Sequence, residues 1–192
     1  MGGYWHLNRN NNRLFAKARG SIIITWQDYI WSKGDAVDRF VSNVLSTGGV
    51  VSGVGDQYES LNKFGKPEIK IWSDPRRTTK FGSFYECMPS DAEWNFCAFP
   101  KQALIDVGGM DEELDFLGYG GDQLQVSERM DAVGYKFYLD QENESYTLRH
   151  NRDDFGGQKE WDSHHVLFNG AYNKRKEQLI TSGQWLKLNY LV

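Results

Sequence analysis

The sequence predicts an α/β fold in which helices flank a mixed β-sheet. Two patterns lead to this prediction. Short runs of β-branched and aromatic residues alternate with segments whose apolar residues recur at helical spacing, and glycine or proline lies between them. The composition is that of a folded protein: of 192 residues, 40% are hydrophobic and 25% are charged. This length suits one core, so we expect a single domain over residues 1–192.

The first half of the chain predicts two helices with a strand between them, followed by two more strands and a turn. Polar residues 8–18 predict a helix, and the β-branched run SIIITWQ at residues 21–27 predicts a buried strand. Residues 34–49 predict a second helix, with Asp35 as its cap and Gly48 as its stop. Two further strands and a turn are expected at residues 50–54, 68–72 and 74–77.

The second half continues the alternation. Residues 93–99 predict a strand, and Pro100 then opens a short helix that ends at Gly108. Residues 122–133 predict a helix that stops at Gly134. Two more strands and a helical tail are expected at residues 135–139, 145–149 and 151–192.

Charge and hydropathy argue against several classes of protein. The net charge is −4, and no basic run is longer than NKRK at residues 173–176, which argues against a nucleic-acid surface. No apolar run approaches the ~20 residues that span a bilayer, and the N-terminus lacks the apolar core of a signal peptide. Cys87 and Cys97 have no metal-site or redox spacing. We therefore expect a cytoplasmic protein without nucleic-acid partners or a membrane span.

Three polar residues lie at the ends of predicted elements. Asp28 follows the first strand, Asp122 follows Gly120 and Gly121 at a helix start, and His150 follows the last strand. Ligands of open α/β sheets bind beyond strand ends, where a carboxylate and an imidazole could share a divalent cation. An acid at a helix start could accept a proton from a bound hydroxyl. The alternatives are a strand-end cap, a helix N-cap and an ordinary buried histidine.

Four stretches occur in the same order in a known family: NNNRLFAKARGSIIITWQD, WNFCAFPKQALIDVGGMDEEL, GYGGDQLQVSERMDAVGYKFYL and TLRH. The first resembles the helix and strand that lead into a D-x-D metal motif. The second resembles an acceptor-side segment with a G-G-F-D-E turn, and the third resembles a G-x-G-G-E-D helix with its G-Y-K strand. The last ends where the family often places a metal-binding His. Over residues 9–150 the chain thus resembles the C-terminal two-thirds of a family 2-type glycosyltransferase with the GT-A fold.

The resemblance implies a fold and a reaction. The fold would be a GT-A-like sheet truncated on its N-terminal, nucleotide-binding side, because only residues 1–27 precede Asp28. The reaction would be inverting transfer of a sugar from a nucleotide-sugar donor to a hydroxyl of a glycan or other acceptor, with Mn or Mg as Lewis acid. Asp28 and His150 would hold the metal, and Asp122 would be the catalytic base.

Further residues are expected at the substrate. The resemblance places there the following positions: Asn12, Asp111, Glu112, Gly120, Gly121 and Gln123. Turn acids that face water are the alternative for Asp111 and Glu112. Trp94 could stack on a sugar, although a strand tryptophan is more often part of the core. Arg76 and Arg77 suit a diphosphate, with a solvated loop as the alternative.

Three residues depart from the family pattern. Gln27 and Tyr29 flank Asp28, so one acid remains where the family has D-x-D. Gln123 stands where the family has its base, and an amide cannot accept the proton. Two alternatives therefore stay open beside the transferase: a catalytically impaired or purely binding remnant of the fold, and a metal-dependent hydrolase.

Overall fold

The computed structural model of the chain describes residues 6–116, 122–149 and 174–183. The chain divides into two compact units, and each is considered by itself. Residues 22–100 and 135–150 form the sheet unit, and residues 1–21, 101–134 and 151–192 form the helical unit. The single domain over residues 1–192 stays a prediction.

The sheet unit contains a mixed sheet of seven strands, which confirms the predicted α/β class. Its main path runs β1-β6-β3-β7-β2, while β4 pairs with β3 and β5 pairs with β7. Neighbours β3 and β7 are parallel, and the other pairs are antiparallel. The strands are β1 (Ile22–Trp26), β2 (Ile30–Ser32), β3 (Val50–Tyr58), β4 (Lys70–Ser73), β5 (Phe84–Cys87), β6 (Phe96–Pro100) and β7 (Phe137–Leu148).

Strand β7 joins the two strands predicted at residues 135–139 and 145–149. Its register against β3 shifts once, because Gly53 lies opposite Asp140 whereas Val54 lies opposite Glu144. The Asp140 carboxylate accepts hydrogen bonds from the backbone N–H groups of Glu142 and Asn143, at 3.0 and 3.2 Å. These bonds stabilise a bulge inside a continuous strand, so the polar residues 140–144 join the two predicted strands into one.

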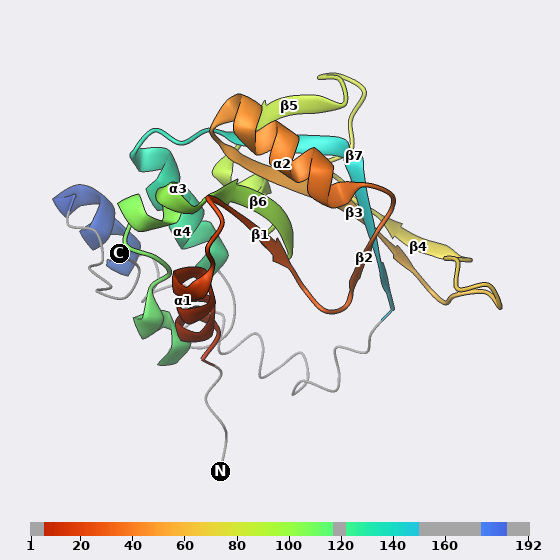
Figure 1. The fold of residues 1–192 in the computed structure, drawn as a ribbon, viewed down its shortest axis with the longest axis horizontal. Helices are drawn as coiled ribbons and strands as arrows, with labels where there is room; N and C mark the ends of the chain where they lie inside the picture. Colours follow the sequence, from red (N-terminus) through yellow and green to blue (C-terminus); the bar gives the residue numbers. More distant parts are fainter. Residues whose placement is uncertain (1–5, 117–121, 150–173, 184–192) are drawn as a thin grey trace, which may run out of the picture. The chain divides into compact units, whose positions relative to one another are not determined.

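Helix α2 (Ala36–Thr47) lies along one face of the sheet, as Figure 1 shows. The core beneath it is the following set of buried residues: Ile30, Ala36, Phe40, Val44, Val51, Phe96 and Ala98. The rings of Phe40 and Phe96 meet edge to face, with centroids 4.9 Å apart. Gly48 ends the helix as predicted, in the left-handed region with φ 67°.

Both ends of the segment 74–93 contact the opposite face of the sheet. Ser52, which alternates with the core residue Val51, accepts hydrogen bonds from Arg76 Nη1 at 3.3 Å and from the Glu93 N–H at 3.2 Å. Arg76 also donates to the carbonyl of Gly53, at 3.2 Å. This segment contains β5 and the short helix η1 (Pro89–Asp91). Arg76 therefore has a structural role in the sheet unit.

Among residues 6–21, 101–116 and 122–134 of the helical unit lie three predicted helices and a short one, η2, that was not expected. They are α1 (Leu7–Lys17), α3 (Lys101–Asp106), the short helix η2 (Glu112–Phe116) and α4 (Asp122–Ala132). Arg129 of α4 is fully buried and donates to the carbonyls of Val107 and Gly109, at 2.6 and 2.7 Å. These bonds fix α4 against the turn after α3. A further helix covers residues 174–182, while the rest of the predicted tail lies outside the described residues.

Candidate functional site

Asn12 connects α1 to the turn that precedes η2. Its amide pairs with the backbone of Met110 in both directions: Oδ1 accepts the N–H and Nδ2 donates to the carbonyl, each at 2.8 Å. Nδ2 also lies 3.1 Å from Glu112 Oε1, and Arg9 Nε lies 3.1 Å from Glu112 Oε2. The structure thus brings Asn12 and Glu112 together, as a shared site requires. Their contact with a substrate stays a prediction.

Asp111 is buried in the same turn, with 2% of its surface exposed. Its Oδ2 accepts a hydrogen bond from Arg175 Nε at 2.9 Å and a longer one from Gln125 Nε2 at 3.4 Å. Burial lowers the pKa of Arg175, but the hydrogen bond and charge of Asp111 outweigh it, so this pKa lies above its ordinary value. The carboxylate is therefore part of an ion pair, which the sequence did not reveal because Arg175 lies 64 residues later.

The helix with the predicted base begins where the sequence indicates. Asp122 is the first residue of α4, and Gln123 lies half-buried in its first turn. Gly120, Gly121 and the Asp122 side chain lie outside the described residues. The roles of these residues in proton transfer and substrate binding stay predictions.

Asp28 lies exposed in the turn between β1 and β2. In the antiparallel pairing of β2 with β7, Ile30 lies opposite Thr147. Asp28 lies two residues before Ile30, in the turn that leads into β2. The predicted ligand His150 lies outside the described part. Strand pairing therefore places Ile30, two residues after Asp28, beside the last residues of β7.

Local hydrogen bonds hold the Asp28 turn. The Gln27 N–H donates to the Asn95 carbonyl at 3.0 Å, and Trp26 Nε1 donates to the Ile30 carbonyl at 2.8 Å. Oε1 of Gln27 is buried and has no hydrogen-bond partner among the described residues. Tyr29 is 43% exposed. The turn thus presents one carboxylate beside an amide and a phenol.

Trp94 lies in the turn before β6, where it is buried. Only 3% of its surface is exposed, and its ring lies 4.6 Å from that of Phe99, centroid to centroid. In the described structure this tryptophan packs in the interior. Its predicted stacking on a sugar is not tested by this arrangement and stays a prediction.

A second charged cluster, which the sequence did not indicate, forms around Asp56 of β3. Asp56 is 3% exposed, and its Oδ2 lies 3.1 Å from Lys70 Nζ and 3.3 Å from Arg77 Nη2. Arg77 Nη1 also lies 3.0 Å from Glu144 Oε1, and Lys33 Nζ lies 3.1 Å from Glu144 Oε2. Parallel pairing of β3 and β7 brings these distant residues together, so no local motif could have predicted the cluster.

Electrostatics in this cluster favour the charged forms. Burial raises the pKa of Glu144, but hydrogen bonds and charges from Lys33 and Arg77 outweigh it and hold that pKa below its ordinary value. Burial lowers the pKa of Lys33, but Glu144 outweighs it and holds that pKa above its ordinary value. The charges thus neutralise one another within the protein.

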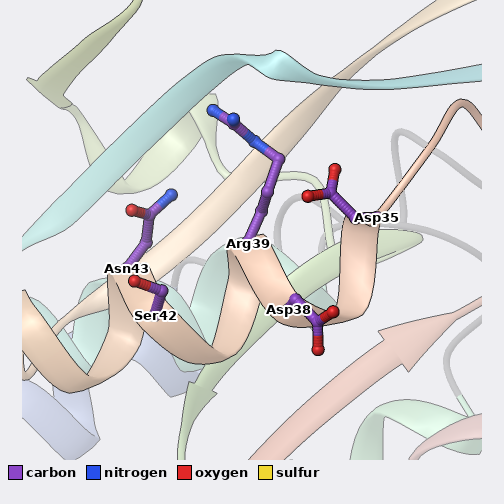
Figure 2. A pocket seen from close by; sticks show the side chains of 5 residues that line it. All are labelled: Asp35, Asp38, Arg39, Ser42 and Asn43. Atoms are coloured by element: carbon purple, nitrogen blue, oxygen red, sulfur yellow. The ribbon is translucent and has the colours of Figure 1, made fainter.

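Helix α2 also lines a shallow polar hollow, drawn in Figure 2. Figure 2 shows Arg39 and Asn43 extending toward β7, while Asp38 points away from it. Arg39 Nη2 contacts Asp140 Oδ1 at 2.8 Å, and Asn43 Nδ2 contacts Asp140 Oδ2 at 2.7 Å. These donors hold α2 to the β7 bulge, so we assign the hollow a structural role.

Comparisons with known proteins identify the fold. No protein-family model matches the sequence, and no curated protein sequence matches it. Among solved structures, that of the glycosyltransferase GalNAc-T7, crystallised with UDP, GalNAc and Mn²⁺, matches with a TM-score of 0.55 at 13% sequence identity. The fold is glycosyltransferase-like. The match covers 76% of this chain and 31% of GalNAc-T7, so the chain spans about a third of that protein.

The structure bears on the predicted metal and membrane properties. In residues 6–116, 122–149 and 174–183, no three His, Cys, Asp or Glu side chains gather as a metal site would require. The predicted ligand His150 lies outside these ranges. None of the described helices has the length and apolar character needed to cross a membrane.

Proposed function

We propose that the chain is part of a glycosyltransferase that moves a sugar from a nucleotide-sugar donor to a hydroxyl of a glycan or other acceptor. The observation that carries this proposal is the pairing of β2 with β7, which brings the first residue of β2, two residues after Asp28, beside the end of β7 in a glycosyltransferase-like fold. The sequence resemblance to family 2-type enzymes supports the assignment of Asp28 and His150 to the donor side.

The proposed reaction is a single displacement with inversion. The acceptor oxygen forms a bond to the anomeric carbon as the bond from that carbon to the diphosphate oxygen breaks. The leaving diphosphate keeps the electron pair, and the proton of the acceptor hydroxyl passes to the carboxylate of Asp122. Asp122 is the first residue of α4, and a carboxylate is a group that can accept this proton.

The residues at the Asp28 turn suit Mn²⁺ or Mg²⁺ in part. Asp28 offers an exposed carboxylate, and carboxylate oxygens suit both ions. His150 would add an imidazole, which suits Mn²⁺ better than Mg²⁺. When bound, such an ion neutralises the charge that develops on the diphosphate. Since Gln27 and Tyr29 replace the acids of the D-x-D pattern, we expect weak binding of the ion alone.

Calorimetric titration with MnCl₂, alone and with UDP or GDP, tests the proposal. We expect weak Mn²⁺ binding that the nucleotide strengthens and that Asp28→Asn reduces at least tenfold. Asp38→Asn is the matched control, because Asp38 is another exposed aspartate and points away from β7. Binding that survives Asp28→Asn would place the ion elsewhere. Product NMR after incubation with UDP- and GDP-sugars would show whether the anomeric configuration inverts.

A second candidate function is a binding domain that retains the fold without turnover. Gln123 favours this candidate, because it occupies the family's base position in the first turn of α4. Such a domain would bind nucleotide and acceptor but would form no product in the NMR assay. Product formation that Asp122→Asn abolishes would exclude it.

A further inference from the structure

Three aromatic side chains form a row on the sheet face opposite α2. The rings of Trp31 and Tyr146 stack with centroids 5.8 Å apart and planes 15° apart. Tyr58 meets Tyr146 edge to face at 5.9 Å. Ile30 belongs to the core under α2, and neighbouring residues of a strand face opposite sides. Trp31 and its row therefore lie on the other face, and Trp31 is 41% exposed.

The Asp56 cluster lies beside this row. Strand register places Asp56 opposite Tyr146, so the two side chains are neighbours on one face. Glu144 lies two residues before Tyr146 and faces the same way. Aromatic rings and charged groups thus share one surface.

The cluster retains hydrogen-bonding capacity that its ion pairs do not use. Asp56 Oδ1 and Arg77 Nε are buried, and neither has a hydrogen-bond partner among the described residues. Buried polar atoms without partners are rare, because each costs free energy unless a bound group satisfies it. The neighbouring Lys70 side chain is 45% exposed, so its movement would open a path to Asp56.

The charges indicate which class of ligand fits. Each of the cations Lys33, Lys70 and Arg77 already contacts a carboxylate, so the surface offers a phosphate no cation without a counter-ion. A sugar hydroxyl both donates and accepts, so it can satisfy Asp56 Oδ1 and Arg77 Nε together. An aromatic ring offers an apolar face to the C–H groups of a sugar.

We infer that this surface binds a neutral glycan, with one sugar ring on Trp31 and its hydroxyl groups bonded to Asp56 and Arg77. Trp31 lies three residues after Asp28, so the glycan would be held near the predicted donor site. As the acceptor site of sugar transfer, the surface rests on the proposed function. As a glycan-binding surface, it stands without it.

Titration with neutral β-linked tetrasaccharides of glucose, N-acetylglucosamine and galactose tests the inference. We expect at least one to bind, Trp31→Ala to weaken binding at least tenfold, and Trp31→Phe to retain most of it. The matched control is Trp72→Ala: Trp72 is 47% exposed but pairs with Gln57, whose side chain faces away from that of Asp56. The control should leave the affinity unchanged.

A second measurement keeps the test valid if Trp31→Ala does not fold. In the unaltered protein, the glycan should shift the NMR signal of the Trp31 indole N–H and leave that of Trp72 in place. Absence of binding by all three tetrasaccharides, or equal losses in Trp31→Ala and Trp72→Ala, would overturn the inference. If UDP binds and no glycan does, the inferred glycan surface is wrong and the proposed donor site is unaffected. If a glycan binds and UDP does not, the result counts against the proposed donor site and leaves the glycan surface in place.

Discussion

The carboxylate of Asp115 caps helix α1 at Asn8, 107 residues earlier in the chain. Its Oδ1 accepts the Asn8 N–H at 2.8 Å, and its Oδ2 accepts the Arg9 N–H at 3.0 Å. The first N–H groups of a helix have no partner within the helix, and a carboxylate there also interacts favourably with the helix dipole. The acidic stretch at residues 111–115 therefore anchors α1 as well as lying in the predicted acceptor segment.

Removal of this cap should destabilise the protein. For Asp115→Ala we expect a loss of about 1–2 kcal/mol in the free energy of unfolding, because two buried N–H groups lose their acceptor. Urea denaturation followed by circular dichroism measures this loss. Asp131→Ala, at an exposed position of α4, serves as the control and should change stability by less than about 0.5 kcal/mol. Equal effects of the two substitutions would show that the cap contributes nothing specific.

Gly53 is a position where β3 tolerates no side chain. A Cβ there would lie 2.5 Å from the Phe96 ring and 2.6 Å from the backbone oxygen of Asn143. Gly53→Ala should therefore cost about 1–3 kcal/mol or prevent folding, because the strand and the β7 bulge must separate. Gly55→Ala is the matched control, since its Cβ meets only Ser145 Oγ, at 3.1 Å. Thermal unfolding measures the stability of both variants. A lower midpoint temperature for Gly55→Ala than for Gly53→Ala would contradict this account.

The Asp74–Arg76 ion pair should make stability depend on acid pH. Burial raises the pKa of Asp74, but hydrogen bonds and charge from Arg76, with the Gly55 N–H, outweigh it and hold this pKa below its ordinary value. Stability from Asp74 is then fully present above its unfolded-state pKa of about 3.9 and is lost as pH falls through the lower folded-state pKa.

The variant Asp74→Asn isolates this contribution. At pH 7 it should cost about 3 kcal/mol, because it removes the nearest carboxylate of the buried Arg76 guanidinium and leaves only Glu93, 3.7 Å away. The difference from the unaltered protein should stay constant above about pH 5 and shrink below about pH 4. Urea denaturation from pH 7 to pH 3 measures it. A difference that does not change with pH would exclude an ionised Asp74.

The proposed base gives a prediction about rate. Asp122→Asn should lower the rate of transfer about 100-fold or more, because an amide cannot take the acceptor proton. Gln123→Asp should raise the rate if the family's base position limits turnover. Asp131→Asn, near the other end of α4, is the control. Equal rates in Asp122→Asn and the control would remove Asp122 from the mechanism.

The sequence predicted the local features of the fold better than the contacts between distant residues. The helix stop at Gly48 and the start of α4 were predicted because caps depend on neighbouring residues. Strands β2 and β5 were missed: the first has only three residues, and the second alternates between exposed and half-buried side chains, so neither forms an apolar run.

For the candidate site the same distinction holds. Asp28 was singled out because it directly follows the strand predicted at residues 21–27, and the structure places it in the turn after β1, whose residues are mostly half-buried. The Asp56 cluster could not be found, because its members come from four separate segments that only the sheet pairing joins. The partner of Asp111 was missed for a similar reason, since Arg175 belongs to a different helix.

The parallel pairing of β3 with β7 has a consequence for synthesis of the chain. Residues 101–134, which belong to the helical unit, are made after β3 and before β7. The centre of the sheet therefore cannot close until residue 148 has left the ribosome, and until then β3 exposes one side of its backbone. Closing so long a loop slows folding and prolongs exposure to aggregation. A nascent chain halted before residue 137 would carry β3 without its parallel neighbour, and it should depend on chaperones far more than the finished protein does.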